Sequence, residues 1–363
     1  MAFEVLAINP GSTSTKIAWF RDDEELWRET IRHDPKELDP YPSIADQFEF
    51  RLRTIEAAIV AHGASLDALS AVVGRGGIVD PIPGGTYVVD EALLKRLRVG
   101  KPWEHASNLG GILADAIGRP RNVPAFIVDP VAVDELDPVA RITGLPELPK
   151  VSLGHALNVK ATVRRAAKDL GKPWDALNFI VVHLGGGITV CAHKQGRMVE
   201  TNNGNDFRPF SPERAGGVPS GDLVRMCCGS ELTMNEMLRK IVGRGGLSAY
   251  TGTSDVREVK TMIAEGDARA KEAYEAMAFA IAKEIGACAA VLSGEVDAVL
   301  FTGGIAFDSD FVALIQKRVQ WIAPALVYPG EDEMPALVQG ALRVLRGEET
   351  GMMYADYTGE ERR

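Results

Sequence analysis

A chain of 363 residues exceeds the size at which one compact core usually stops growing, so about two domains are expected. Hydrophobic residues make up 46% and charged residues 25%, as in ordinary globular proteins, and no apolar run reaches the ~18 residues of a membrane helix. The formal net charge of −10 argues against a nucleic-acid partner, which needs a basic face.

The start of the chain and the cysteines bear on location. No basic segment followed by a long apolar run opens the sequence, so no secretory signal is expected. The four cysteines show no Cys-x-x-Cys spacing, and Cys227 and Cys228 are adjacent, which suits neither a zinc site nor an ordinary bridge. We therefore expect a cytoplasmic protein with buried, reduced thiols.

The first predicted element is a strand hairpin with a polar turn. A strand over Glu4–Ile8 leads into Asn9-Pro10-Gly11-Ser12-Thr13-Ser14-Thr15-Lys16, and a second strand follows through Phe20. The spacing is not that of a P-loop, in which the glycine turn precedes a helix. Hydroxyls and bare backbone indicate a phosphate cradle, and a Ser/Thr-rich surface turn is the alternative.

Three charged side chains then follow predicted strands or precede a helix. A strand over 71–73 ends in Gly74-Arg75-Gly76-Gly77, where Arg75 has room to bind a carboxylate or phosphate, unless it is an ordinary loop arginine. His105 precedes a helix over 109–117, where a core or helix-start histidine is the alternative. The strand 125–128 delivers Asp129 to a sheet edge, as a metal ligand or a turn cap.

A domain boundary is predicted near the end of the proline-rich segment Pro138 to Pro149. We expect one domain over 1–151, to which a C-terminal helix over 334–348 packs back, and a second over 152–333. The second opens with a helix from Gly154 to Leu170.

A second glycine hairpin lies in the second domain. Ile180 to His183 leads into Gly185, Gly186 and Gly187, and an apolar run over 188–192 follows. Alone it could be an ordinary tight turn, but the chain makes such an element twice. Two facing turns can hold the two ends of a polyphosphate between domains.

Two later patterns are typical of a nucleotide pocket. Gly252-Thr253-Ser254-Asp255-Val256-Arg257 indicates a helix start, with a plain N-cap as the alternative role of Asp255. A strand over 298–301 enters Thr302-Gly303-Gly304-Ile305, where glycines let a ring or phosphate lie against the backbone. The residues alone thus predict a two-domain phosphate-handling protein.

Seven motifs in order make the chain resemble the acetate kinase group of the sugar kinase, heat-shock chaperone and actin ATPase superfamily. They begin at Ile8, Gly74, His183, Gly216, Thr253, Phe301 and Tyr328, the last reading Tyr328-Pro329-Gly330-Glu331-Asp332-Glu333-Met334. The resemblance implies an α/β fold of two ribonuclease-H-like (actin-like ATPase) domains with an interdomain active-site cleft. It also implies reversible phosphoryl transfer between ATP and a short-chain carboxylate, with Mg²⁺ and a homodimer or larger homo-oligomer.

The resemblance also implies roles for single residues. Asn9, Ser12 and Ser14, with Gly11 and Lys16, would face the transferred phosphoryl group. Arg75 would meet the carboxylate or the transition-state charge, and His105 would sit beside the acyl group. Asp129 and Glu333 would organise Mg²⁺. The second set serves the nucleotide: His183, Gly185, Gly186 and Gly187 for the phosphates, and Asp255, Val256, Arg257, Gly303, Gly304 and Ile305 for adenosine.

The chain departs from acetate kinases in three places. They carry an arginine in the segment matching 217–222, and here Arg208 or Arg214 would replace it, or the chain would dispense with it. The acetate kinase histidine that precedes the position of His155 has no counterpart here, and Val151 lies near its position. Gly76 and Gly77 stand where acetate kinases carry bulkier apolar residues, which predicts a wider acyl pocket suited to butyrate or branched acids. Kinases of propionate or branched acids, and a nucleotide-driven clamp ATPase of the same fold, are the alternatives.

Overall fold

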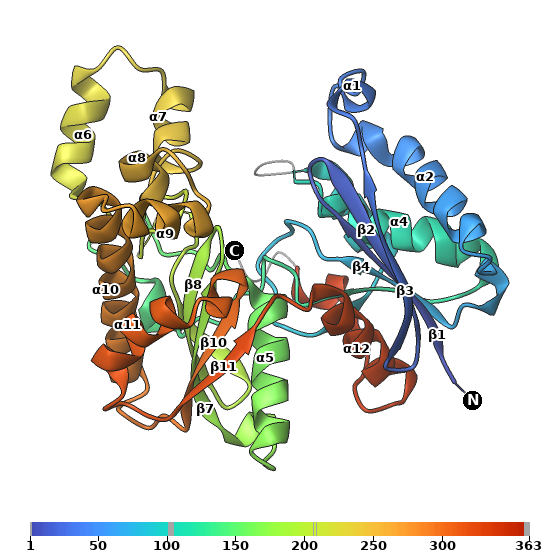
Figure 1. Ribbon diagram of the computed structural model, residues 1–363. Helices are drawn as coiled ribbons and strands as arrows, with labels where there is room; N and C mark the ends of the chain where they lie inside the picture. The colour runs from blue at the N-terminus through green and yellow to red at the C-terminus, as the bar shows by residue number, and fades with distance from the viewer. Residues whose placement is uncertain (1, 101–104, 206, 208, 359–363) are drawn as a thin grey trace. The chain divides into compact units, whose positions relative to one another are not determined.

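The computed structural model describes residues 2–100, 105–205, 207 and 209–358, and it divides the chain into two compact units (Figure 1). Unit 1 comprises Met1–Asp134 and Asp332–Arg363, and unit 2 comprises Glu135–Glu331. The boundary therefore precedes the predicted position near 151. Glu135 explains the shift, because its carboxylate binds the Lys160 ammonium at 2.9 Å and accepts the Met198 N–H at 2.7 Å, both in unit 2.

Unit 1 is built on a seven-stranded sheet in the order β12-β5-β6-β4-β1-β2-β3. Its strands are β1 Glu4–Pro10, β2 Ser14–Arg21, β3 Glu24–Arg32, β4 Ala71–Arg75, β5 Thr86–Val88, β6 Ala125–Val128 and β12 Met352–Met353. The first three strands form an antiparallel meander, whereas β1, β4 and β6 run parallel. The carboxyl ends of β1 and β4 therefore meet at one edge.

The helices of unit 1 are α1 Pro35–Leu38, α2 Phe48–Ala61, α3 Glu91–Val99, α4 Asn108–Gly118 and α12 Glu333–Leu345. Of these, α2, α4 and α12 contact the strands. Glycines on α4 and α12 let these helices approach β6 from opposite sides: Ile127 faces Gly111, and the next residue, Val128, faces Gly340. The C-terminal helix α12 is thus part of unit 1, in contact with β1, β4 and β6.

Unit 2 repeats this strand arrangement in a five-stranded sheet of order β11-β10-β7-β8-β9. Its strands are β7 Asn178–Leu184, β8 Ile188–Lys194, β9 Arg197–Thr201, β10 Ala298–Gly303 and β11 Ala325–Pro329. An antiparallel meander, β7-β8-β9, again adjoins two parallel strands. The order matches β6-β4-β1-β2-β3 of unit 1, so the glycine hairpins begin equivalent sheets.

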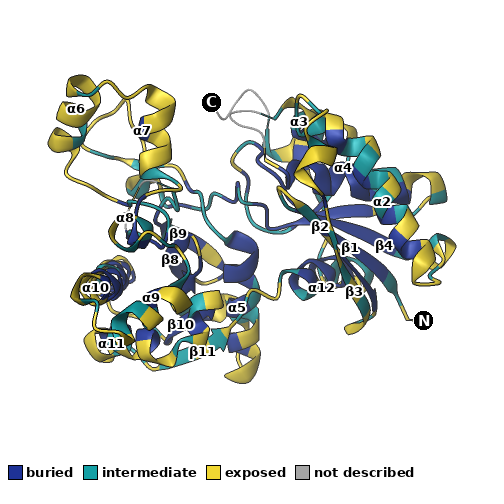
Figure 2. Cartoon of the chain, turned by 45° about the horizontal axis from the view of Figure 1, so that its top comes forward, coloured by how far each residue is buried: buried dark blue, intermediate teal, exposed yellow. Residues whose placement is uncertain are grey.

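The helices of unit 2 differ sharply in burial. They are α5 Ala156–Asp169, α6 Ser220–Gly229, α7 Met234–Ile241, α8 Leu247–Thr251, α9 Val256–Ala264, α10 Ala268–Val291 and α11 Ser309–Val319. The alanine-rich α10 packs against β7 and β8 and buries eleven residues. The helix α6, by contrast, buries none (Figure 2).

Burial corrects the prediction for two of the thiols. All four cysteines are free, and Cys191 and Cys288 are buried as expected. Cys227 and Cys228, however, are exposed, because they lie on α6. No helix in the described part of the chain is long and apolar enough to cross a membrane.

Candidate active site

The turn between β1 and β2 borders a cavity of about 240 Å³ in unit 1. The cavity is lined by Asn9, Pro10, Gly11, Ser14, Lys16, Arg75, His105, Ser107 and Glu333. Most predicted phosphoryl and acyl contacts thus lie around one space. Ser12 is exposed on the same turn but does not line the cavity.

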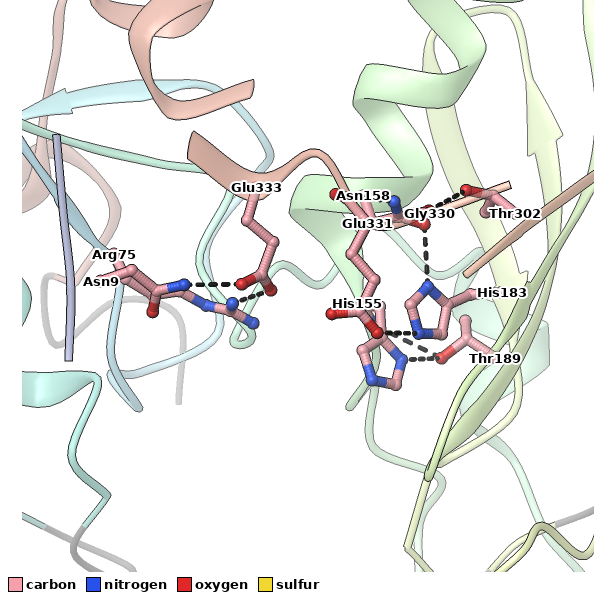
Figure 3. A network of polar contacts seen from close by, with 10 residues as sticks. All are labelled: Asn9, Arg75, His155, Asn158, His183, Thr189, Thr302, Gly330, Glu331 and Glu333. Carbon is pink, nitrogen blue, oxygen red and sulfur yellow. Dashed lines mark hydrogen bonds and ion pairs between the residues drawn. The ribbon is translucent and has the colours of Figure 1, made fainter. Parts of the chain in front are cut away.

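A carboxylate joins the two strand ends at this cavity (Figure 3). The Arg75 guanidinium at the end of β4 forms an ion pair with Glu333 Oε1, and Asn9 Nδ2 at the end of β1 donates to Glu333 Oε2 at 2.6 Å. The Arg75 and Glu333 side chains are only 18% and 16% exposed. The pair thus holds a cation and a carboxylate where an anionic substrate could exchange partners with them.

His105 contributes an uncharged ring to the same cavity. Its Nδ1 lies 2.7 Å from Ser107 Oγ. Burial, and secondly the charge of Arg75, lower the pKa of His105 below its ordinary value. A neutral imidazole at pH 7 can donate or accept a hydrogen bond without adding charge.

An apolar cavity of about 10 Å³, room for roughly one water, adjoins His105. It is lined by Ile44, Ala45, Leu97, Asn108, Leu109 and Ile112 besides the histidine. Sequence reasoning assigned none of these residues to the acyl group. Residues 44, 97 and 112 lie far apart in the sequence and meet through tertiary packing, so no local pattern marks them.

The widening of the acyl pocket by Gly76 and Gly77 stays a prediction, and the structure shows why both positions are glycine. A Cβ on Gly76 would lie 2.5 Å from Pro130 Cβ, and a Cβ on Gly77 would lie 2.5 Å from Asn108 Oδ1. Neither glycine lines the 240 Å³ cavity or the small cavity beside His105. At both positions glycine permits close packing against Pro130 and Asn108.

The two predicted metal ligands have different surroundings. Glu333 lines the cavity, whereas Asp129 does not and its Oδ1 accepts the Gly85 N–H at 2.7 Å. Within the described residues no group of three His, Cys, Asp or Glu side chains could hold a metal ion. Glu333 and the amide oxygen of Asn9 do offer two oxygen donors in one cavity. These fit Mg²⁺, which commonly takes one or two protein oxygens together with phosphate and water.

The larger cavity, about 760 Å³, lies in unit 2. It is lined by Gly185, Gly186, Pro212, Ser254, Asp255, Val256, Arg257, Lys260, Gly304, Ile305, Phe307, Asp308, Ser309 and Glu331. The predicted phosphate turn and the two predicted adenosine segments therefore surround one space. Gly187 and Gly303 are outside its lining.

Asp255 both caps a helix and borders this cavity. Its Oδ1 accepts the Arg257 N–H at 2.9 Å at the start of α9, and its carboxylate pairs with the Arg257 guanidinium at 2.6 Å. Bonds from the Arg257 side chain and backbone lower the pKa of Asp255 to about 2. Asp255 is therefore the N-cap residue of α9 and also borders the cavity.

A hydrogen-bond network around Asp308 also borders the cavity, and sequence reasoning missed it. Asp308 Oδ1 accepts from Lys260 Nζ at 2.7 Å, and its Oδ2 accepts from the Tyr274 hydroxyl at 2.6 Å. The hydrogen bond to this carboxylate raises the pKa of Lys260. Burial raises the pKa of Tyr274, and the hydrogen bond to the same carboxylate raises it further. The Asp-Ser-Asp sequence at 308–310 signalled a helix start, and the partners at 260 and 274 gave no signal.

His183 at the end of β7 is held in one orientation (Figure 3). Asn158 Nδ2 donates to the Glu331 carbonyl at 3.1 Å, so its Oδ1 accepts from His183 Nδ1 at 2.8 Å. The opposite ring nitrogen, Nε2, lies 3.6 Å from Glu331 Oε1. His155 stacks on this ring with centroids 3.8 Å apart.

Arg214, one of the two cations considered as a replacement, lies behind the second glycine turn. Its guanidinium donates to the Gly204 carbonyl at 2.7 Å and occupies the space that a Cβ on Gly187 would take. Burial lowers the pKa of Arg214. Arg208 lies outside the described residues.

Comparisons with known proteins agree with these motifs. A model of the Acetokinase family matches residues 155–321. The chain is 50% identical over 355 residues to butyrate kinase 2 of Clostridium acetobutylicum and to a probable butyrate kinase of Clostridium botulinum, covering 98% of this chain and 100% of each relative.

Solved structures support the fold. The acetate kinase of Porphyromonas gingivalis matches with a TM-score of 0.79 at 19% identity, over 94% of this chain and 100% of that one. A propionate kinase of Francisella tularensis matches with a TM-score of 0.75 at 18% identity, over 93% of this chain and 98% of that one. These likenesses confirm the predicted fold class, a two-domain α/β protein.

Proposed function

The chain belongs to the acetokinase family, as its motifs predicted, and from this membership we propose that it is a butyrate kinase. The reaction is reversible transfer of the γ-phosphoryl group of ATP to butanoate, giving butanoyl phosphate and ADP. The single observation that carries the substrate is 50% identity over nearly the whole chain to a butyrate kinase.

The chemistry needs charge neutralisation rather than a base. A carboxylic acid with a pKa near ~4.3 is already ionised at pH 7. Its oxygen attacks phosphorus in line, the bond to the β–γ bridging oxygen breaks, and ADP takes the electron pair. The obstacle is the approach of an anion to a polyanion, which placed cations and N–H donors reduce.

In unit 1 we assign the acceptor side of this reaction. Arg75 exchanges part of its bond to Glu333 for the carboxylate or the transferred phosphoryl group, and Lys16 adds a second positive charge at the same cavity. Asn9 and Ser14 present amide and hydroxyl groups beside them, Gly11 lines the cavity with its backbone, and Ser12 lies on the same turn. His105, held neutral, binds the acid without opposing its charge.

Mg²⁺ belongs to this proposal with Glu333 and the Asn9 amide oxygen as its protein ligands. When bound it would neutralise charge on the phosphate oxygens. Asp129 is proposed only from the family resemblance, as a more distant carboxylate. Its test is Asp129→Asn: the Mg²⁺ concentration that gives half-maximal rate should rise.

In unit 2 we assign the nucleotide. Gly185 and Gly186 present backbone to the phosphates, and His183, oriented by Asn158, lies at the same strand end. Gly304, Ile305 and the segment from Asp255 to Arg257 contact adenosine. Gly187 and Gly303 serve this site through the shape of the backbone, since they do not line the cavity.

The acyl chain is proposed to lie in the 240 Å³ cavity beside His105, with its end toward the small apolar space lined by Leu97, Leu109 and Ile112. Each methylene that an apolar pocket accepts is worth about 1–3 kcal/mol, so butanoate should exceed acetate in kcat/KM by at least about a hundredfold. Propionate or isobutyrate as the better acid is the alternative within this class.

An acyl-hydroxamate assay with ATP, Mg²⁺ and a series of acids tests the proposal. We expect product with butanoate and much less with acetate. A preference for acetate would overturn the substrate, and acid-independent ATP hydrolysis without hydroxamate would favour a clamp ATPase instead.

Oligomerisation and location complete the proposal. Exposed apolar residues on α6 and α7, among them Val224, Met234 and Leu238, support a homo-oligomer, which light scattering would measure. A cytoplasmic location is supported by two free buried thiols in the core, Cys191 and Cys288, and would be checked by cell fractionation.

A further inference from the structure

Arg51 on α2 has the largest of the fully buried side chains in the described structure, with 0% of its surface exposed. A buried guanidinium normally pairs with a carboxylate, because taking an ion out of water is costly. Here the described hydrogen-bond partners are all neutral oxygens. Arg51 thus carries a charge that these partners do not cancel.

Four of those oxygens belong to the first glycine turn. Arg51 Nη1 donates to the carbonyls of Gly11 at 2.9 Å and Ser14 at 3.2 Å, and to Thr15 Oγ1 at 3.0 Å. Nη2 donates to the Ser12 carbonyl at 3.1 Å. The side chain also bonds to Gln47, the N-cap residue of α2, whose Oε1 accepts from Nη2 at 2.8 Å.

These bonds decide where the amides of the turn point. In a planar trans peptide the N–H points away from the preceding C=O. Because the carbonyls of Gly11 and Ser12 face Arg51, the N–H groups of Ser12 and Thr13 face away from it. Neither amide has a hydrogen-bond partner within the described residues. Two such amides side by side form a concavity suited to an anion.

The pKa of the neighbouring His33 is sensitive to the charge of Arg51. His33 Nε2 lies 2.9 Å from Thr15 Oγ1, the hydroxyl that Arg51 also contacts. Burial and then the charge of Arg51 lower the pKa of His33, against a smaller opposite effect of Glu37. Burial lowers the pKa of Arg51 itself to about 10, so it remains protonated at pH 7. The interior beneath the turn is therefore positive.

We propose that Arg51 is a positioning residue that makes the Gly11–Ser14 turn an anion receptor. It holds the carbonyls inward, turns the Ser12 and Thr13 amides outward, and adds an uncancelled positive charge behind them. The identity of the anion as the transferred phosphoryl group rests on the proposed function. The receptor itself rests on geometry alone.

The test compares Arg51→Lys, which keeps the charge, with Arg51→Gln, which keeps hydrogen-bond donors and loses it. Arg53→Gln is the matched control, because Arg53 is exposed on the same helix. For Arg51→Gln we expect kcat to fall by about a hundredfold or more, with KM for ATP within about threefold, since the nucleotide contacts lie in unit 2. Arg51→Lys should recover at least tenfold of the loss.

A second measurement needs no variant that must fold. Proton NMR of the His33 ring in the unaltered chain gives its pKa with and without saturating inorganic phosphate. An anion on the turn partly cancels the charge of Arg51, so the pKa of His33 should rise. The proposal is overturned if phosphate leaves it unchanged, if folded Arg51→Gln retains a rate within threefold, or if Arg51→Lys is no better than Arg51→Gln.

These outcomes separate the two proposals. Normal kinase activity in Arg51→Gln would refute the proposed role of Arg51 and would not affect the proposal that the chain is a butyrate kinase. An absence of kinase activity in the unaltered chain, with His33 still responding to phosphate, would remove the enzyme and leave the anion receptor.

Discussion

Replacing Arg75 with alanine separates the chemical role of the ion pair from its structural one. The Arg75 guanidinium pairs with Glu333 at the end of α12, and both side chains are less than one-fifth exposed. Removing the arginine leaves a largely buried carboxylate bonded only to Asn9 among its described partners in the cavity. Two free energies change, that of unfolding and that of the transition state.

The two effects have different sizes. Breaking a fully buried pair costs about 3–5 kcal/mol, and partial exposure here reduces this to about 1–3 kcal/mol. In a unit of this size that lowers Tm by about 3–10 °C. Loss of one donor to the developing charge costs about 3–4 kcal/mol in the transition state, so kcat should fall by about 10²–10³.

Kinetics, calorimetry and nucleotide binding together check this reasoning. KM for ATP should change little, because the nucleotide cavity lies in unit 2. Arg343→Ala is the control, since Arg343 pairs with Glu349 at 2.8 Å in the same unit with similar exposure. It should lower Tm comparably at a normal rate. An Arg75→Ala enzyme that is destabilised yet fully active would refute the assignment.

Three further outcomes are expected. In Arg75→Ala the pKa of His105 should rise, because a neighbouring positive charge no longer opposes protonation; NMR titration would show this, and an unchanged value would contradict it. Asn158→Ala should lower kcat/KM for ATP by about tenfold to a hundredfold, because the His183 ring loses a bond worth about 1–3 kcal/mol, whereas Asn158→Asp should retain most activity. A thiol reagent should modify two of the four cysteines in the native protein, Cys227 and Cys228, since burial raises the pKa of the other two; labelling that persists in a double serine variant would count against this.

Local pattern sufficed where the decisive contacts are close in sequence. The two glycine hairpins, the strand before Asp129 and the N-cap at Asp255 follow from alternation, turn residues and capping within a few positions. The boundary near 151 was placed too late, because the Glu135 bonds to Lys160 and Met198 reach across sequence.

The sequence by itself determined the family, the two repeated sheets and most residues around the 240 Å³ cavity, because short motifs in a fixed order specify them. Only the tertiary structure decided what those residues contact. Glu333 meets Arg75 across 258 positions, and Arg51 reaches the Gly11 carbonyl across 40. Gly76 and Gly77 look like missing side chains in a sequence, and the backbone of Asn108 and the ring of Pro130 show why none can fit. Burial and close packing depend on segments far apart in the chain, and no periodicity within one segment records them.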